Sequence, residues 1–185
     1  MPSVISHAVV AIALKAAFPE PGVPRRLVVL GAACSMAPDV DVIGFRFGIQ
    51  YGDILGHRGL SHSLAFAAAL ALLGLVAAFP RPAPPVRRGL VLLYLFLATA
   101  SHGLLDAMTD GGLGVAFLAP FNNTRYFFSF TPIAVSPIGL TSFISARGLH
   151  VLMSEMLWVW LPSLFFSLIA LSLWRLRAPR LESNA

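Results

Sequence analysis

Histidines and carboxylates carry most of the chemistry that this chain could perform. The densest group is the run His57-Arg58-Gly59-Leu60-Ser61-His62-Ser63, which places two imidazoles, a guanidinium and two hydroxyls just before a long apolar stretch. Imidazole nitrogens and carboxylate oxygens are common ligands of zinc and related divalent ions. The other candidate ligands are His7, Asp39, Asp41, His102, Asp106 and Glu155.

His102 and Asp106 have the clearest spacing for a shared ion. They are four residues apart in a segment expected to be helical, so both side chains project from one face of the helix. At this spacing they can bind one divalent ion, or the carboxylate can orient the imidazole through a hydrogen bond. Asp39 and Asp41 follow Pro38 at the end of another expected helix. The alternative to metal binding is a structural role in a turn, in which Asp side chains accept hydrogen bonds from nearby backbone amides.

The central run leaves one assignment open. His57 and His62 are five residues apart and cannot share a helical face. One of them is therefore expected in a loop and the other on the first turn of the following helix, and either could be the metal ligand. Ser61 or Ser63 can cap that helix. Arg58 is either an interfacial anchor or a clamp for phosphate or carboxylate.

Composition decides the environment of these residues. Of the 185 residues, 57% are hydrophobic and only 11% are charged, against about 25% charged in a typical soluble domain. The mean hydropathy is +0.81. We therefore expect an all-α integral membrane protein, folded as a single domain over residues 1–185. The net charge of +5 is explained by basic residues at the ends of apolar segments and does not indicate nucleic-acid binding.

The positions of helix-breaking residues along the chain predict about five transmembrane helices in a compact bundle. Prolines and glycines at 19–24 and 81–85 mark turns, and residues 39–58 and 109–148 read as loops. Helices are expected at about 3–18, 24–38, 60–79, 86–108 and 149–174, the first two being short for a span of about 30 Å.

Alternating these helices across the bilayer sorts the chain by chemistry. One side receives most of the basic residues and, by the positive-inside rule, is cytoplasmic together with the C-terminus. The other side receives every histidine, the candidate carboxylates and the long 109–148 loop. We therefore expect one composite, extracytoplasmic site. The basic residues are Lys15, Arg25, Arg26, Arg81, Arg87, Arg88, Arg175, Arg177 and Arg180.

The motifs also carry a family resemblance. Pro38-Asp39-x-Asp41, His57-Arg58-Gly59-x-Ser61-His62-Ser63 and His102-x-x-Leu105-Asp106-x-x-Thr109, with His7 and Pro120-Phe121, resemble the bacterial family of membrane-bound metal-dependent hydrolases. That family is also described as LexA-regulated inner-membrane hydrolases. The order of ligands is more remotely similar to zinc-dependent phospholipase C and P1-type nucleases. Those proteins have a tryptophan ligand and a His-x-x-x-Glu motif that this chain lacks, which favours one or two ions over three. The metal ligands that the resemblance implies are His7, Asp39, His57 or His62, His102 and Asp106.

The expected function is that of a metal-dependent hydrolase in the bacterial inner membrane. Its cofactor would be zinc, or alternatively manganese or iron, and it would cleave an ester or phosphoester in a membrane lipid or lipid-linked substrate. Asp41 or Glu155 would be the general base. Arg58, Arg125 and Ser136 would contact the substrate. The alternative is a non-catalytic metal-binding membrane protein, either a transporter or an assembly factor. The uncharged middles of the helices at 65–76 and 90–99 argue against a transport path.

Overall fold

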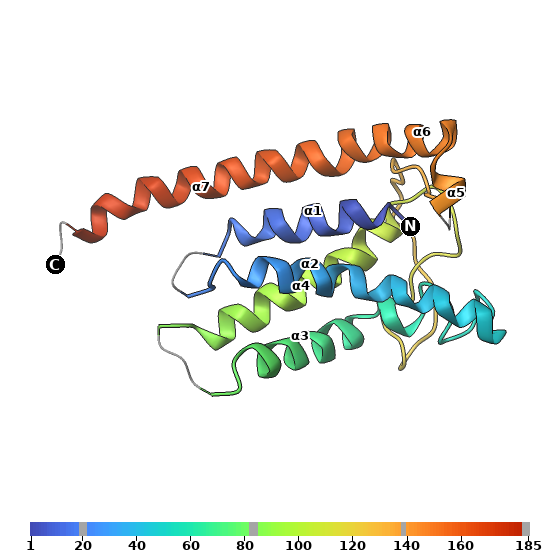
Figure 1. Ribbon diagram of the computed structural model, residues 1–185, viewed down its shortest axis with the longest axis horizontal. Coiled ribbons are helices and arrows are strands. Elements are labelled where there is room, and N and C mark those ends of the chain that lie inside the picture. Colours follow the sequence, from blue (N-terminus) through green and yellow to red (C-terminus); the bar gives the residue numbers. More distant parts are fainter. Residues whose placement is uncertain (19–21, 82–84, 138–139, 183–185) are drawn as a thin grey trace.

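Helical rods lie roughly side by side and form the body of the protein (Figure 1). The computed structural model describes residues 1–18, 22–81, 85–137 and 140–182. Within them no strand forms, and extended pairing is limited to isolated bridges. The all-α prediction is therefore confirmed. The rods are α1 (Val4–Lys15), α2 (Leu27–Met36) continued by the 3₁₀-helix η1 (Ala37–Phe47), α3 (Leu64–Ala78), α4 (Arg88–Ala107), and α6 (Ala146–Glu155) continued through the π-helical turn η3 (Met156–Trp160) into α7 (Leu161–Glu182).

Three of these rods are long and apolar enough to cross a bilayer. They are Leu27–Phe47, Arg88–Ala107 and Ala146–Leu176, with 21, 20 and 31 residues. Helices α1 and α3 are apolar but have only 12 and 15 residues. At about 1.5 Å per residue, both are shorter than a hydrocarbon core of about 30 Å. The bundle thus combines three candidate spans with two shorter apolar passes.

Close packing of α1, α2 and α4 fixes the positions of the side chains at the ends of the bundle. Tyr94 of α4 is fully buried, and its hydroxyl donates to the carbonyl of Ala11 at 3.1 Å. A Cβ atom at Gly31 of α2 would lie 2.2 Å from the Tyr94 Oη. Only glycine therefore lets α2 approach α4 this closely.

Two expected loops contain more helix than predicted. Residues 39–58 are helical as far as Phe47, because Pro38 lies in the first turn of η1, where proline costs no backbone hydrogen bond. The rod ends at Gly48, whose φ of 81° stops the helix. Within 109–148, α5 (Leu140–Phe143) and the first turn of α6 are helical, and Ser145 caps α6 through the Gly148 amide. Of the turns expected at 19–24 and 81–85, residues 19–21 and 82–84 lie outside the described residues.

The two ends of the bundle differ in the loops and in the charged residues that they carry. One end carries the 48–59 and 109–137 segments and the N-terminus (Figure 1). The other end carries the α3–α4 connection and the C-terminal end of α7. The basic residues cluster toward this second end, since Lys15 ends α1, Arg26 precedes α2, and Arg88 begins α4. The side chains of Arg177 and Arg180 lie outside the described part of the structure.

Candidate metal centre

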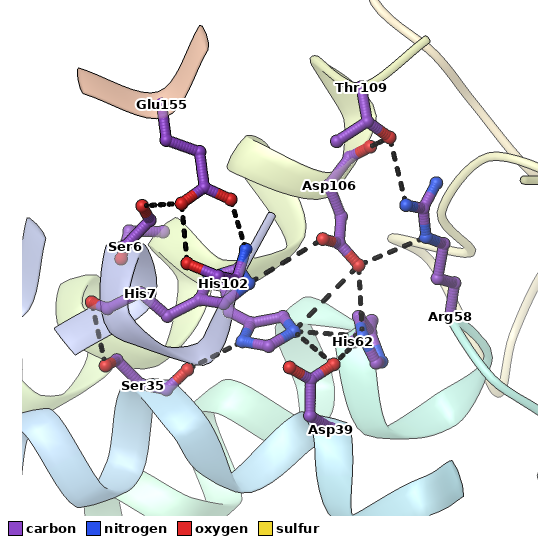
Figure 2. Close-up of polar contacts among 12 residues, drawn as sticks. Ser6, His7, Ser35, Asp39, Arg58, His62, His102, Asp106, Thr109 and Glu155 are labelled. Atoms are coloured by element: carbon purple, nitrogen blue, oxygen red, sulfur yellow. Dashed lines mark hydrogen bonds and ion pairs between the residues drawn. The ribbon is translucent and has the colours of Figure 1, made fainter. Parts of the chain in front are cut away.

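Four ligand-type side chains from distant parts of the chain meet at the loop-bearing end of the bundle. They are Asp39 of η1, His62 of η2 (Leu60–His62), and His102 and Asp106 of α4. One ligand atom from each lies within 4.8 Å of the others, and all four residues are buried. Figure 2 shows their side chains converging. We call these four residues the inner cluster.

The spacing of the inner cluster suits a small divalent ion. The Nε2 atoms of His62 and His102 are 3.0 Å apart. Asp39 Oδ1 lies 3.3 Å from His102 Nε2, and Asp106 Oδ2 lies 3.3 Å from His62 Nε2. Ligands about 2.0–2.1 Å from a tetrahedral zinc ion are separated from each other by roughly 3.3 Å. The cluster therefore has the dimensions of a four-ligand metal site.

Hydrogen bonds fix which nitrogen of each imidazole faces the cluster. His102 Nδ1 lies 2.6 Å from the carbonyl oxygen of Ser35, so Nδ1 must be the donor. The Ser61 hydroxyl gives its only proton to Asp41 Oδ2 at 2.5 Å. His62 Nδ1, 2.9 Å from the same hydroxyl, must then donate to it. Both Nε2 atoms are left to present lone pairs to each other, an arrangement that requires a cation between them.

In the absence of a metal, that cation is a proton. Burial alone would lower the pKa of His62, but its contacts with Asp106, Asp39 and Asp41 outweigh this effect and raise the pKa to about 10. The same position could take a metal ion, since the ligands of a divalent cation are neutral imidazoles and carboxylates.

Unpaired oxygens provide an independent test of the fit. Both carboxylate oxygens of Asp39 and of Asp106 are buried and have no hydrogen-bond partner. The surrounding imidazoles lie close enough for ion pairing but lack hydrogen-bond geometry. Buried polar atoms are rarely left unpaired, and exceptions often mark an ion that would bind there. A metal ion therefore fits the residues present.

A second group of residues lies on the outer side of His62. Asp41, His57 and His62 also offer ligand atoms within 4.8 Å of one another. His57 Nδ1 lies 2.7 Å from Asp41 Oδ1, and Ser61 bonds the other Asp41 oxygen. We call Asp41, His57 and Ser61 the outer group. Both Asp41 oxygens already have hydrogen-bond partners, unlike the carboxylate oxygens of Asp39 and Asp106.

These positions separate the two histidines that the sequence left open. His62 belongs to the inner cluster and also touches the outer group, whereas His57 pairs with Asp41 and meets the inner cluster only at the His62 ring. The expected ligand His7 lies beside the cluster: its ring stacks on His102 at 3.6 Å between centroids, and its Nε2 is 3.8 Å from Asp106 Oδ1. Both His7 nitrogens are buried without hydrogen-bond partners. His7 therefore lies beside the inner cluster on the Asp106 side, and its role as a ligand stays a prediction.

Arg58 holds Asp106 in position, and all three of its guanidinium nitrogens contact protein atoms. Its side chain is fully buried, and its Nε lies 3.2 Å from Asp106 Oδ2. Its two terminal nitrogens donate to the Thr109 hydroxyl and the Gly111 carbonyl, both at 2.9 Å. Its backbone has a φ of 64°, uncommon for a residue with a side chain. These contacts give Arg58 a positioning role at Asp106, and its expected role in substrate binding stays a prediction.

The other expected substrate and base residues have structural partners. Glu155 accepts bonds from the Ser3 amide and from the hydroxyls of Ser3 (2.5 Å) and Ser6 (2.7 Å), so it fastens α6 to the start of α1. Arg125 donates to the carbonyls of His57, Tyr51 and Asp53 and braces the 48–59 segment. The amide of Ser136 donates to the Met1 carbonyl. These contacts are structural, and the expected roles of Glu155 as base and of Arg125 and Ser136 as substrate ligands stay predictions.

Two residues that orient the cluster were not assigned that role from the sequence. Ser35 offers its backbone carbonyl to His102, and its hydroxyl bonds the carbonyl of His7 at 3.0 Å. Thr109 joins Arg58 to the end of α4. A contact made by a backbone carbonyl leaves no signal in the type of residue, so Ser35 could not be found this way. Thr109, three residues after Asp106, was visible only as part of the motif.

Comparison with known proteins agrees with the membrane assignment. Residues 1–178 match the family model described as YdjM inner membrane protein. The chain is also 38% identical over 179 residues to the protein named Inner membrane protein YbcI of Escherichia coli (strain K12), an alignment that covers 96% of this chain and 100% of that protein. No solved structure matches. These comparisons lend no support to the more remote likeness to phospholipase C and P1-type nucleases. The chain belongs to the YdjM family of inner membrane proteins.

Proposed function

We propose that this inner membrane protein is a metal-dependent hydrolase whose ion is held by the inner cluster. The observation that carries the proposal is the pair of inward-facing Nε2 atoms, 3.0 Å apart and flanked by two carboxylates without hydrogen-bond partners. Zinc suits mixed imidazole and carboxylate ligands, and manganese or iron(II) are the alternatives. His7 would add a ligand if the site holds a second ion.

The chain's own residues divide the work of such a reaction. A bound divalent ion would lower the pKa of a coordinated water from about 15.7 to near 7 and polarise the scissile bond. Asp41 stands on the outer side of His62, with one carboxylate oxygen 3.2 Å from its Nδ1. There it would accept a proton as general base. His57 and Ser61 hold the Asp41 carboxylate in one orientation through a hydrogen bond to each oxygen.

The location of the site supports an amphiphilic substrate. The inner cluster lies at one end of a membrane bundle, within reach of lipid headgroups, and the basic residues gather toward the other end. By the positive-inside rule we assign the basic end and the C-terminus to the cytoplasm and the metal site to the periplasmic face. Lipid esters and phosphoesters are the first substrates to test.

One observation favours a non-catalytic alternative. The inner cluster supplies four protein ligands, and a tetrahedral zinc ion bound by all four has no position left for water. Such a site would be structural, and the protein would be a metal-binding assembly factor or transporter. An ion of higher coordination, or release of one carboxylate, restores an open position.

A hydrolysis assay separates these functions. The purified protein would be stripped with chelator, reloaded with zinc, manganese or iron(II), and assayed on phospholipids and on lipid carboxylic esters. We expect turnover that chelator removes, and a loss of about 10²-fold or more in Asp41→Asn. Asp53→Asn is the matched control, because Asp53 is an exposed carboxylate of the adjacent loop. Stoichiometric metal with no turnover of any substrate would establish the non-catalytic alternative.

A further inference from the structure

An apolar groove of about 460 Å³ opens beside the outer group. Its lining comes from the start of η1, the 48–59 segment, η2 and the first turn of α3. A groove of this size falls in the range of about 300–1,000 Å³ typical of small-molecule sites. The lining residues are Ala37, Pro38, Val40, Asp41, Leu55, Leu60, Ser61 and Phe66.

The polar members of this lining are the residues already linked to the metal centre. Asp41 and Ser61 bond each other at 2.5 Å, and Ser61 touches His62 of the inner cluster. The remaining lining residues are apolar. The groove therefore presents a hydrocarbon-like wall together with a polar contact point beside the proposed ion, which is the distribution of polarity in a lipid.

The rim of the groove is open to the surrounding medium. Val40 and Leu55 line it and are 61% and 57% exposed, and Ile43, one turn of η1 further on, is 51% exposed. Large exposed apolar side chains at the end of a membrane bundle lie against lipid and not against bulk water. The medium from which the groove fills is then the acyl layer of the bilayer.

We propose that this groove binds one acyl chain of a bilayer lipid and brings the lipid's ester linkage to Asp41 and Ser61. The inference deepens the proposed function by naming the substrate class, an acyl-chain lipid. As a statement about hydrolysis it rests on that function, but chain binding itself requires neither metal nor turnover. A second apolar groove, of about 370 Å³ between α3 and α4, offers a built-in comparison because its lining includes no charged residue.

Photolabelling tests the inference. The protein would be reconstituted in phosphatidylethanolamine and phosphatidylglycerol vesicles that contain a phosphatidylethanolamine with a diazirine in its acyl chain. After irradiation, labelled peptides are mapped by mass spectrometry with metal bound and after chelation. We expect labelling of segments 37–41 and 55–66 above that of the α3–α4 groove in both states.

Two exposed positions provide matched variants. Val40→Trp would fill the groove beside Asp41, and Ala68→Trp would fill the α3–α4 groove. We expect Val40→Trp to lower labelling of segment 55–66 by about tenfold, the change that follows when roughly two buried methylene groups lose their contacts. Ala68→Trp should leave that labelling unchanged.

The outcomes separate this inference from the proposed function. Equal labelling of both grooves, or labelling unaffected by Val40→Trp, would show an ordinary lipid-facing surface and overturn the inference, while metal binding and turnover stood untouched. Specific labelling without turnover would support chain binding and count against the hydrolase. A tryptophan variant that failed to insert would be replaced by Leu55→Trp, which faces the same groove from another segment.

Discussion

The inner cluster and the outer group both contain imidazoles and carboxylates, but they differ in whether the carboxylate oxygens have hydrogen-bond partners. In the inner cluster, Asp39 and Asp106 have buried oxygens without hydrogen-bond partners. In the outer group, both oxygens of Asp41 receive hydrogen bonds, from His57 and Ser61. Imidazoles and carboxylates alone do not identify a metal site. Buried carboxylate oxygens that lack hydrogen-bond partners distinguish a cation site from a hydrogen-bonded network.

The two regions share part of their support. The inner cluster is carried mainly by α4 and by the α2–η1 rod, whose approach is fixed by Gly31 and Tyr94. In the outer group, Asp41 shares η1 with Asp39, and Ser61 lies in η2 beside His62. Only His57 comes from the 48–59 segment, which Arg125 braces through three backbone carbonyls.

The largest expected effect comes from exchanging equivalent acids in the two regions. Asp39→Asn removes a charged ligand from the inner cluster and should weaken metal affinity by more than about 100-fold, the upper end for residues that only support ligands. Asp41→Asn, two residues later, should weaken affinity by only about tenfold, because Asp41 contacts the ligand His62 through Nδ1 and does not itself face the ion. Competitive titration with a metal indicator measures both. Equal losses of metal affinity in the two variants would show that the inner cluster and the outer group act as one metal site.

A smaller effect is expected from the residue that supports Asp106 through Arg58. Thr109→Val removes the hydroxyl that accepts from the guanidinium and should lower metal affinity by about tenfold. Thr99→Val is the control, because Thr99 is a buried threonine of α4, the helix that ends just before Thr109, and its hydroxyl bonds only its own backbone turn. A drop of similar size in both variants would assign the loss to general damage in α4.

The smallest effect on metal affinity is expected at Glu155. Glu155→Gln weakens the contacts to Ser3 and Ser6 and should lower the free energy of unfolding by about 1–3 kcal/mol. Its metal affinity should stay near that of the unaltered protein. Thermal unfolding in detergent and metal titration would be measured on the same sample. A loss of turnover at unchanged stability would support the predicted role of Glu155 as general base.

Much of the site's location was predictable from the sequence because threading apolar segments back and forth is a strong constraint. Alternation alone gathers His7, His62 and His102 at one end, away from most of the basic residues. The four-residue spacing of His102 and Asp106 on a helix needed no further information. These features depend on helix periodicity and membrane thickness, which leave clear traces in composition.

The remaining details depend on contacts that composition does not record. The choice between His57 and His62 is decided by the path of a non-helical segment, in which Arg58 takes a φ of 64°. The role of Glu155 depends on the serines at the start of α1, which are distant in sequence. The helical run through Asp39 to Phe47 was obscured because aspartates and glycines read as loop, although Gly48 alone ends it.

The central claim is that the inner cluster binds a divalent ion, and elemental analysis of the purified protein tests it most directly. The protein would be isolated in detergent without chelator, and metal per chain measured by mass spectrometry for the unaltered chain, His102→Ala and His150→Ala. His150 is exposed on α6 and serves as the matched histidine control. We predict stoichiometric metal in the unaltered chain and in His150→Ala, and its loss in His102→Ala with membrane insertion intact. Metal retained in His102→Ala, or an unaltered chain that binds none even on titration, would contradict the account.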